Sequence, residues 1–411
     1  MNPLYTFGVY VVWFLSTYFV VLLLLLIAVN KERLYEKRKP LLHTPRVSII
    51  VPAYNEEAKI AETIASLQKI GYPAIEFILV NDGSKDATSK VIHSAIAGDS
   101  RFQFIDRAQN KGKAASLNEG IQHAKGVFVA CMDADSIVEP DIFQKTLPYF
   151  DDPNTGAVTV TVELRNPNTF LQKIIDIEYI IGLSLFLKIF SLLDCVFVTP
   201  GPFSIYRRSL LEEIGGFDPT NITEDHEIAY RIHKRGYSIA NCLEAKVYTL
   251  TPDTFKGIYV QRRRWYSGAL QTVFQHRDVL FNRKLGLFGY FTPYNYLLIS
   301  SGMIIFYTST YLSLSHLLET LWHYHYTNFN FFEHLLEFQF DILRFGRISM
   351  IGLSALAFTL LLMFTGLWFS NKQFSTKKAG MLGFPLMFFL YQIFWTGAIL
   401  AILRRKKVTW R

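Results

Sequence analysis

Two carboxylates separated by one residue, Asp133 and Asp135, follow directly after an apolar run that ends at Met132. In an extended strand, side chains two positions apart point to the same side, so both carboxylates could face one cation. Mg²⁺ and Mn²⁺ favour oxygen ligands and often share them with the phosphates of a substrate. A D-x-D pattern also arises by chance at polar strand ends, but the preceding apolar strand favours the metal interpretation. We therefore predict that Asp135, together with Asp133, holds Mg²⁺ or Mn²⁺.

Two further carboxylates stand at positions suited to binding and to proton transfer. Asp82 follows another apolar run and precedes Gly83, where it could bind a nucleobase or ribose or serve only as a turn residue. Asp225 lies in the sequence Thr223-Glu224-Asp225 and could remove a proton from a hydroxyl group. The alternative is that Thr223 caps a helix that begins at Glu224, and the two interpretations are compatible.

A run of three arginines lies between Gln261 and Trp265. Guanidinium groups bind phosphate oxygens in bidentate fashion, and an indole offers a flat face and an N–H donor. The same arginines could instead contact lipid headgroups, because the stretch 255–280 is amphipathic and strongly basic. Both interpretations stay open at the level of the local sequence.

The segment from Arg46 to about Leu250 alternates short apolar runs with amphipathic stretches, a pattern typical of a sheet with helices on both faces. We expect strands over 47–53, 77–80, 102–105 and 127–132, and helices over 57–67, 86–97 and 112–124. The predicted fold class is α/β, with a mixed, mostly parallel sheet. Ligands bind such sheets at the carboxyl ends of the strands, which is where Asp82, Asp133 and Asp135 fall.

Long apolar runs flank this segment and predict membrane-spanning helices. The run from Phe7 to Val29 can cross a hydrocarbon layer of about 30 Å. Basic residues follow it, which predicts an uncleaved anchor with its N-terminus outside. Further spans are expected at 285–314, 348–369 and 381–403. Four crossings would return the C-terminus to the outside, whereas the basic run 404–407 favours the inside, so a further crossing or re-entrant piece near Asn328 to Leu343 is an alternative.

The predicted organisation has five parts. These are a transmembrane anchor (1–30), a cytoplasmic α/β domain (46–250), an interfacial amphipathic segment (251–284), C-terminal transmembrane helices (285–403) and a basic tail (404–411). An interfacial position is also predicted for 170–193, an apolar stretch with spaced polar residues. The alternative for 170–193 is a helix in the core of the α/β domain.

The composition is typical of a membrane protein and disfavours several other classes. Half of the 411 residues are hydrophobic, and the formal net charge is +8 with basic residues beside the apolar runs. Nucleic-acid binding is not expected, because the sequence has no separate basic domain. The three cysteines form no C-x-x-C pair, which argues against zinc sites and disulfides and fits a cytoplasmic domain. The first strand is not followed by a glycine-rich phosphate loop, which argues against a dehydrogenase.

Taken in order, these motifs resemble the family 2 glycosyltransferases that build polysaccharides at membranes, such as cellulose, chitin, hyaluronan and poly-N-acetylglucosamine synthases. The resemblance rests on Asp82 in Val-Asn-Asp-Gly-Ser, on Asp133-Ala134-Asp135, on Thr223-Glu224-Asp225 and on Gln261 to Trp265, with 51–56 and 110–118 in support. It covers Arg46 to about Gln275. It implies a GT-A-like (Rossmann-like) sheet domain with transmembrane and interfacial helices.

The resemblance also implies a role for each matching position. Asp225 would be the general base, Asp135 would ligate the metal, and Asp133 would contact the donor diphosphate. The other nucleotide and donor contacts would come from Pro52, Ala53, Tyr54, Glu56, Asp82, Lys113, Gln261, Arg264 and Trp265. The acceptor region would comprise Gly201, Pro202, Phe203, Ser204, Glu224 and Trp265.

The reaction implied by the resemblance is the metal-dependent transfer of a hexose from a nucleotide sugar, such as UDP-N-acetylglucosamine or UDP-glucose, with inversion at the anomeric carbon. The expected acceptor is a growing polysaccharide at the plasma membrane, and a small membrane protein or a second copy of the chain are candidate partners. The alternatives are single-sugar transfer to a membrane lipid and a non-catalytic sensor of nucleotide sugars. The arginine run favours the polymer, and the intact carboxylates disfavour the sensor.

Overall fold

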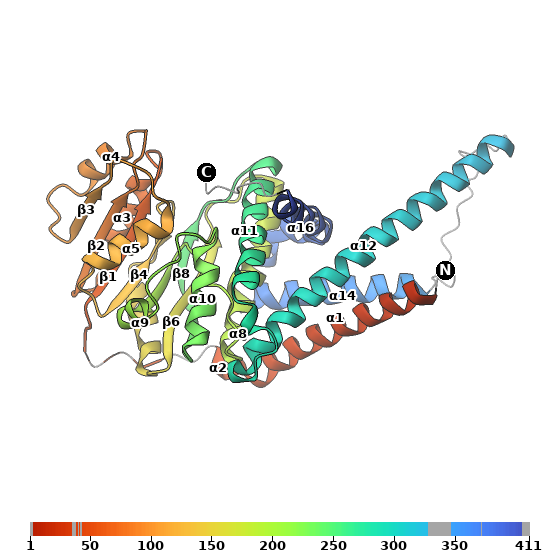
Figure 1. Cartoon of the computed structure of the whole chain (residues 1–411), viewed down its shortest axis with the longest axis horizontal. Coiled ribbons are helices and arrows are strands. Elements are labelled where there is room, and N and C mark those ends of the chain that lie inside the picture. The colour runs from red at the N-terminus through yellow and green to blue at the C-terminus, as the bar shows by residue number, and fades with distance from the viewer. Residues whose placement is uncertain are drawn as a thin grey trace. The chain divides into compact units, whose positions relative to one another are not determined.

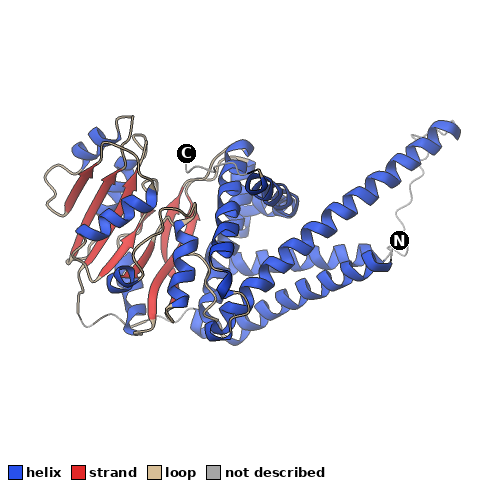
Figure 2. Ribbon diagram, viewed as in Figure 1, coloured by secondary structure: helices blue, strands red, loops and turns tan. Residues whose placement is uncertain are grey.

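The computed structural model describes residues 3–34, 38–39, 41, 43–327, 347–370 and 372–404 (Figure 2). The chain forms two compact units, one made of Met1–Leu25 and Pro293–Leu362 and the other of Leu26–Thr292 and Met363–Arg411. The suggested extra crossing at 328–343 and the tail 405–411 lie outside the described residues.

An eight-stranded sheet forms the centre of the larger unit, with strand order β3-β2-β1-β4-β7-β6-β8-β5 (Figure 1). The strands are β1 (Val47–Ala53), β2 (Ile75–Asn81), β3 (Phe102–Asp106), β4 (Phe128–Cys131), β5 (Ile137–Val138), β6 (Thr155–Leu164), β7 (Ser204–Arg207) and β8 (Ser238–Thr249). β1 pairs in parallel with β2 and β4, β2 with β3, and β6 with β8, whereas the pairs β4–β7, β6–β7 and β5–β8 are antiparallel. The predicted mixed, mostly parallel α/β fold is confirmed.

The first four strands explain why polar side chains meet at one edge of the sheet. β1 is buried along its whole length, because the helices α3 (Ile60–Gln68), α4 (Thr88–Ala95) and α5 (Lys113–His123) pack near it and its neighbours. Close packing of α5 requires Gly120, since a Cβ there would overlap the side chain of Ile50. Ala53 pairs with Asn81, and Ile50 pairs with Cys131. The segments that follow β1, β2 and β4 therefore leave the sheet at the same edge.

The segment 170–193 forms one long helical stretch, made of α7 (Phe170–Tyr179), the π-helical η2 (Ile180–Phe186) and α8 (Leu187–Leu192). A capping box between Thr169 and Gln172 fixes its start. Its side chains Ile174, Ile175 and Ile189 are buried. The structure thus supports the core-helix alternative for this segment rather than an exposed interfacial one.

The helix α10 (Glu224–Lys234) follows the loop that ends at Thr223, and α11 (Phe255–Gln275) follows β8. The two helices lie side by side (Figure 1). Next along the chain are the short turns η3 (Arg277–Val279) and η4 (Arg283–Leu285). The remaining short elements are α2 (Lys31–Leu34), α6 (Ile142–Thr146), η1 (Leu147–Asp151) and α9 (Arg208–Glu213).

The C-terminal part of the larger unit packs on α7 and α11. The apolar run predicted as one span from Met381 to Leu403 forms two helices, α15 (Phe374–Gly383) and α16 (Met387–Leu403), separated by the turn η6 (Phe384–Leu386). α15 approaches α7 closely at Gly380 and Gly383, where a Cβ would overlap atoms of α7. α16 lies along α11, with the rings of Tyr266 and Trp395 stacked 4.3 Å apart.

In the described part of the chain, four helices are long and apolar enough to cross a membrane, by length and composition: Tyr5–Val29, Arg283–Tyr326, Gly352–Phe369 and Phe374–Leu403. They correspond to α1 (Pro3–Val29), α12 (Gly286–Thr327), α14 (Arg347–Phe369) and the α15–α16 pair. α12 has 42 residues and extends beyond the predicted end at Leu314. In the smaller unit, the Trp13 indole N–H donates to Ser354 Oγ at 2.7 Å, which ties α1 to α14.

Candidate active site

A buried lysine brings two acidic segments together. Lys113 is the first residue of α5, and its side chain is only 9% exposed. Its Nζ lies 2.6 Å from Asp133 Oδ1 and 2.7 Å from Glu224 Oε1. Although burial alone would lower the pKa of Lys113, the carboxylates of Asp133, Glu224 and Asp225 raise it well above its usual value. Lys113 is therefore a permanent cation that joins the start of α5, the segment after β4 and the start of α10.

The Asp133–Asp135 pair sits in a turn and not in an extended strand. β4 ends at Cys131, and the Ser136 N–H donates to the Asp133 carbonyl at 3.2 Å, which closes the turn. The prediction that Asp133 and Asp135 face the same side because they lie in an extended strand is therefore wrong. Both still lie close enough to Tyr179 of α7 for their charges to contribute to raising its pKa, which burial and these carboxylates bring to about 12.

Asp225 lies in the first turn of α10, beside the Lys113 cluster. Its carbonyl accepts hydrogen bonds from the Thr199 N–H at 3.0 Å and from Thr199 Oγ1 at 2.9 Å, which fix the backbone. Burial and the neighbouring Glu224 raise the pKa of the Asp225 carboxyl group, while Lys113 and Arg264 oppose the rise. A carboxylate whose pKa is moved towards neutrality is a better general base than an ordinary Asp.

A helix does begin at Glu224, but the cap by Thr223 that the sequence offered as an alternative does not form. The Thr223 side chain makes no capping hydrogen bond to α10. Its Oγ1 instead lies 3.4 Å from Asn221 Oδ1, inside the preceding loop. Thr223 is also the residue against which α11 packs, because a Cβ on Gly268 would overlap Thr223 Oγ1.

Asp82 holds the loop that leads into α5. It is 3% exposed, and its carboxylate accepts from Arg107 Nη1 at 3.0 Å, from the Lys111 N–H at 2.9 Å and from the Gly112 N–H at 2.8 Å. These contacts position Lys113, the next residue along the chain. The structure thus gives Asp82 a positioning role within the protein, beside the nucleotide contact that the sequence predicts for it.

The other predicted nucleotide contacts lie around the end of β1, near Asp82. Pro52 and Ala53 are buried in the strand, and Tyr54, just after it, is half-buried. Glu56 is buried, and its backbone N–H donates to Thr88 Oγ1 at 2.8 Å. The predicted group thus shares one sheet edge with Asp82, whose backbone N–H donates to the Ala53 carbonyl at 2.8 Å.

In the predicted acceptor segment, Gly201 lies against the Lys113–Asp133 ion pair, whereas Phe203 and Ser204 are buried in the core. A Cβ on Gly201 would lie 2.7 Å from Lys113 Nζ and 3.1 Å from Asp133 Oδ2. Pro202 is half-buried, whereas Phe203 and Ser204 are buried in the core, where Ser204 Oγ donates to the Pro200 carbonyl at 3.0 Å. Phe203 and Ser204 therefore support this segment from behind rather than facing an acceptor.

The arginine run lies on α11, and its three arginines have different surroundings. Arg262 is 3% exposed and donates to Glu178 Oε2 at 2.7 Å. Arg263 lies over the ring of Tyr259, 5.7 Å from its centroid. Arg264 is close enough to Asp225 to lower its pKa. Among the described residues, Gln261 Oε1 is buried without a hydrogen-bond partner.

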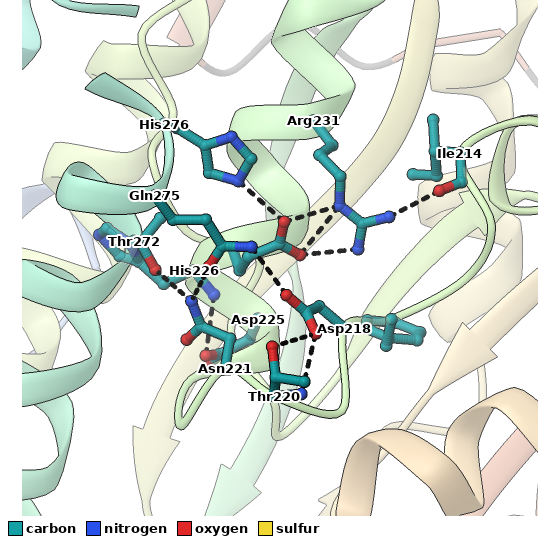
Figure 3. Close-up of polar contacts among 12 residues, drawn as sticks. Ile214, Asp218, Thr220, Asn221, Asp225, His226, Arg231, Thr272, Gln275 and His276 are labelled. Carbon is teal, nitrogen blue, oxygen red and sulfur yellow. Dashed lines mark hydrogen bonds and ion pairs between the residues drawn. The ribbon is translucent and has the colours of Figure 1, made fainter. Parts of the chain in front are cut away.

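A polar network fixes α11 against the loop before α10 (Figure 3). Asn221 Nδ2 donates to Thr272 Oγ1 and to Gln275 Oε1, both at 3.1 Å. Gln275 Nε2 donates in turn to Asp218 Oδ2 at 2.8 Å. The distance between Asp225 and the arginine run is therefore set by many contacts and not by one.

A second part of this network lies deeper, around Glu227 of α10. Glu227 is 1% exposed, and its carboxylate accepts from Arg231 Nε at 2.7 Å and contacts His276 Nε2 at 2.9 Å. Burial would raise the pKa of Glu227, but the hydrogen bonds from His276 and Arg231 lower it. The end of α11 is thereby tied to the helix that carries Asp225.

Comparisons with known proteins agree with this arrangement. Residues 45–268 match the family model described as "Glycosyltransferase like family 2". This chain belongs to glycosyltransferase family 2. The glycosyltransferase is 30% identical over 318 residues to a poly-β-1,6-N-acetyl-D-glucosamine synthase of Staphylococcus epidermidis, which covers 77% of this chain and 74% of that one. It is 34% identical over 223 residues to the synthase of the same name from Staphylococcus aureus strain COL, which covers 54% of each chain.

A solved structure shows the same fold at lower sequence similarity. The mannosyltransferase PcManGT from Pyrobaculum calidifontis, in complex with GDP-Man and Mn²⁺, matches with a TM-score of 0.64 and 18% identity. The match covers 97% of this glycosyltransferase and all of the other chain. The sheet domain and the long helices of this glycosyltransferase are therefore a known architecture.

The residues present fit a hard divalent cation. Asp133 and Asp135 offer carboxylate oxygens, and no group of three or more His, Cys, Asp and Glu side chains arranged to hold a metal occurs in the described part of the glycosyltransferase. Two carboxylates suffice for Mg²⁺ or Mn²⁺, because these ions complete their coordination with water and substrate phosphates. Asp135 and Asp133 therefore remain the candidate ligands.

The sequence did not predict a role for three residues that lie near the site. Thr199 fixes the backbone of Asp225, Glu178 and Tyr179 of α7 contact the arginine run, and Tyr179 also lies near the acidic turn. For Glu178 a signal existed, since a charged side chain inside an apolar stretch is commonly buried with a partner. No comparable signal marks Thr199, whose role depends on the tertiary structure.

Proposed function

We propose that this family 2 glycosyltransferase extends a polysaccharide at the membrane, taking its sugar from a UDP-sugar, with UDP-N-acetylglucosamine as the first candidate. The observation that carries the proposal is the convergence of Asp133, Lys113, Glu224 and Asp225 at one edge of the sheet. The names of the staphylococcal relatives support the choice of polymer and sugar. Those relatives align over parts of the chain beyond the sheet domain, which supports an acceptor handled beside membrane helices.

Proton transfer from the acceptor is assigned to Asp225. Its backbone is fixed by Thr199, and its raised pKa suits it to accept the proton of an acceptor hydroxyl group. Attack of that hydroxyl on the anomeric carbon, opposite to the leaving diphosphate, inverts the configuration. A second nucleophilic carboxylate is not required, because no covalent sugar intermediate forms.

The positively charged groups of the site stabilise the negative charge on the leaving diphosphate. Lys113 and Arg264 carry fixed positive charges next to Asp225, where they stabilise the charge that develops on the phosphate oxygens. Mg²⁺ or Mn²⁺ on Asp135 and Asp133 would supply Lewis-acid stabilisation of the same oxygens. Trp265 and Gly201 would border the acceptor, and Asp82 with the end of β1 would hold the nucleotide.

We assign the chain to the plasma membrane as a multi-pass protein with the sheet domain in the cytoplasm. The four apolar helices support the membrane assignment. Buried free cysteines in the sheet unit, Cys131, Cys195 and Cys242, fit a reducing compartment. Labelling of single engineered surface cysteines with a membrane-impermeant reagent in whole cells tests this orientation, and labelling of the sheet domain from outside would refute it.

The experiment for the proposed function is a donor screen with the full chain in membranes. UDP-N-acetylglucosamine, UDP-glucose and GDP-mannose are each incubated with Mg²⁺, with Mn²⁺ or with a chelator, and nucleoside diphosphate release and product length are measured. We expect metal-dependent release of UDP and a polymer. A product with a single added sugar would replace this proposal with transfer to a lipid acceptor. Donor binding without release of nucleoside diphosphate would refute the assignment as a catalyst.

A further inference from the structure

The first arginine of the run carries a charge that is buried in the protein interior. Arg262 is 3% exposed, and its guanidinium lies 4.2 Å from the centroid of the Trp265 indole. At its other side, Nη2 donates to Glu178 Oε2 at 2.7 Å. A buried arginine held between a carboxylate and an aromatic face is well placed to fix that aromatic ring.

The carboxylate that holds Arg262 is shared with a helix from the far end of the chain. Glu178 Oε1 accepts a hydrogen bond from the Tyr391 hydroxyl at 2.8 Å, so each oxygen of Glu178 has its own partner. Tyr391 lies on α16, which also contacts α11 through the stacked rings of Tyr266 and Trp395. The carboxylate of Glu178 on α7 thus contacts both α11 and α16.

The residue that follows Glu178 on α7 lies near both the arginine run and the acidic turn. Tyr179, the next residue after Glu178, lies 5.7 Å from the Arg262 guanidinium, measured to the ring centroid. The charges of Asp133 and Asp135 act on the same tyrosine. The helix α7 therefore borders both the arginine run and the acidic turn, although it belongs to neither motif.

We propose that Glu178 and Arg262 are positioning residues that hold the Trp265 indole at the acceptor side of the site, with Tyr391 attaching α16 to this arrangement. Charge neutralisation by Glu178 and burial make Arg262 unsuited to binding a donor phosphate, a role that is left to Arg264. A desolvated guanidinium over an indole attracts it more strongly than an exposed one does, and this attraction favours one orientation of a side chain with two rotatable bonds.

An optical experiment tests the indole position without any assumption about the substrate. The full chain in detergent is compared with Trp265→Phe, and the difference in tryptophan emission and near-ultraviolet circular dichroism gives the signal of Trp265. We expect Arg262→Met to change this signal. The same substitution in the Trp265→Phe background should leave the spectra unchanged, because the affected indole is then absent.

Arg263→Met is the matched control, since it removes a neighbouring arginine whose guanidinium lies over Tyr259 and not over Trp265. It should leave the Trp265 signal as it is. If Arg262→Met prevents folding, Glu178→Gln and Tyr391→Phe replace it, because each keeps the size of its side chain. An unchanged Trp265 signal in the Arg262 or Glu178 variants, or an equal change in the control, would overturn the proposal.

A kinetic experiment separates positioning from donor binding, and this arm rests on the proposed function. With UDP-N-acetylglucosamine and Mn²⁺, Arg262→Met should lower kcat at least tenfold with little change in the KM for the donor. Arg262→Lys should recover part of the loss, because an ammonium group keeps a positive charge over the indole. A rise in donor KM with unchanged kcat would show that Arg262 binds the donor and refute its positioning role. Failure of the wild type to turn over any donor would refute the proposed function, and the optical experiment would still decide this inference.

Discussion

Replacing Asp225 with Asn should remove sugar transfer and leave donor binding in place. The substitution preserves the side-chain size and the hydrogen bonds of Thr199 to the backbone, so the start of α10 should keep its position. An amide cannot accept the acceptor proton, and loss of a general base costs about 10²–10⁴ in rate. Because Lys113 and the acidic turn are untouched, the Kd for UDP-N-acetylglucosamine with Mn²⁺ should change by less than about tenfold, or about 1.4 kcal/mol.

Asp225→Asn should also stabilise the folded protein, and this gain in the free energy of unfolding should grow with pH. The pKa of Asp225 is raised in the folded state, mainly by burial, so the folded protein keeps this proton over a pH range in which the unfolded chain has lost it. The ionised carboxylate therefore destabilises the fold as pH rises above the unfolded value of about 3.9. A difference of one pH unit between the folded and unfolded pKa values corresponds to about 1.4 kcal/mol. The stability gained by Asp225→Asn should thus be absent near pH 4, grow with pH and level off above the folded pKa.

Three measurements check this pair of expectations. Nucleoside diphosphate release gives the turnover, isothermal titration with UDP-N-acetylglucosamine and Mn²⁺ gives donor affinity, and thermal unfolding of the detergent-solubilised chain between pH 4 and 8 gives stability. Asp225→Glu serves as a control that keeps a carboxylate. Near-normal turnover of Asp225→Asn would refute the assignment of the base. A stability gain that shrinks as pH rises would refute the reasoning about burial.

Three further predictions concern the metal, the packing of α11 and the buried network. Asp135→Ala should weaken donor binding in Mn²⁺ and have little effect in a chelator, as measured by titration under both conditions. Gly268→Ala should cost about 1–3 kcal/mol of stability and lower turnover, because its methyl group meets Thr223; Thr223→Ala in the same chain should recover part of the stability. Glu227→Gln should cost about 3–5 kcal/mol near pH 7, since it leaves the partners of a buried carboxylate uncompensated. Because the pKa of Glu227 is lowered, in part by His276, this cost should begin to shrink as pH falls below the unfolded value of about 4.3 and should be lost only below the folded pKa, as measured by thermal unfolding.

The parallel half of the sheet was predictable because its strands carry a strong local signal. β1 and β2 are nearly continuous apolar runs of seven residues each, and the structure has them within two residues of the predicted ends. The helices between the strands were also found, although α3 begins at Ile60 and not at the predicted position 57. In these segments local pattern and tertiary burial favour the same conformation, so one window of sequence suffices.

The remaining half of the fold depends on contacts that no local window contains. β7 has four residues and pairs with β4 and β6 from distant parts of the chain. The core position of 170–193 follows from α15 packing on α7, about two hundred positions away along the sequence. The break between α15 and α16 lies within a run whose hydropathy alone predicts one uninterrupted span. Local hydrophobicity does not reveal which surface covers a helix.

In the candidate site, too, the residue types could be predicted from the sequence but their arrangement could not. Asp133, Asp135 and Asp225 were chosen from their residue type and position, and the structure places Asp133 and Asp225 close to Lys113. The Lys113 pairing with Asp133 and Glu224 could not be derived, since it joins positions up to 111 apart in sequence. The extended strand expected at Asp133 was wrong and the alternative cap by Thr223 does not form, because both depend on the local backbone geometry.

The π-helical turn η2 between α7 and α8 accommodates one extra residue. The orientations of α7 and α8 relative to each other depend on that residue. In an α-helix each residue adds about 100° of rotation, so the extra residue accommodated by a π turn rotates everything that follows relative to a regular helix. Tyr179 ahead of η2 and Ile189 beyond it are both buried. Deleting one residue, such as Gly182, would restore regular winding and swing α8 away from β8 or Glu178 away from Arg262. Insertions and deletions within 180–186 should therefore be rare among functional relatives, even where substitutions are frequent.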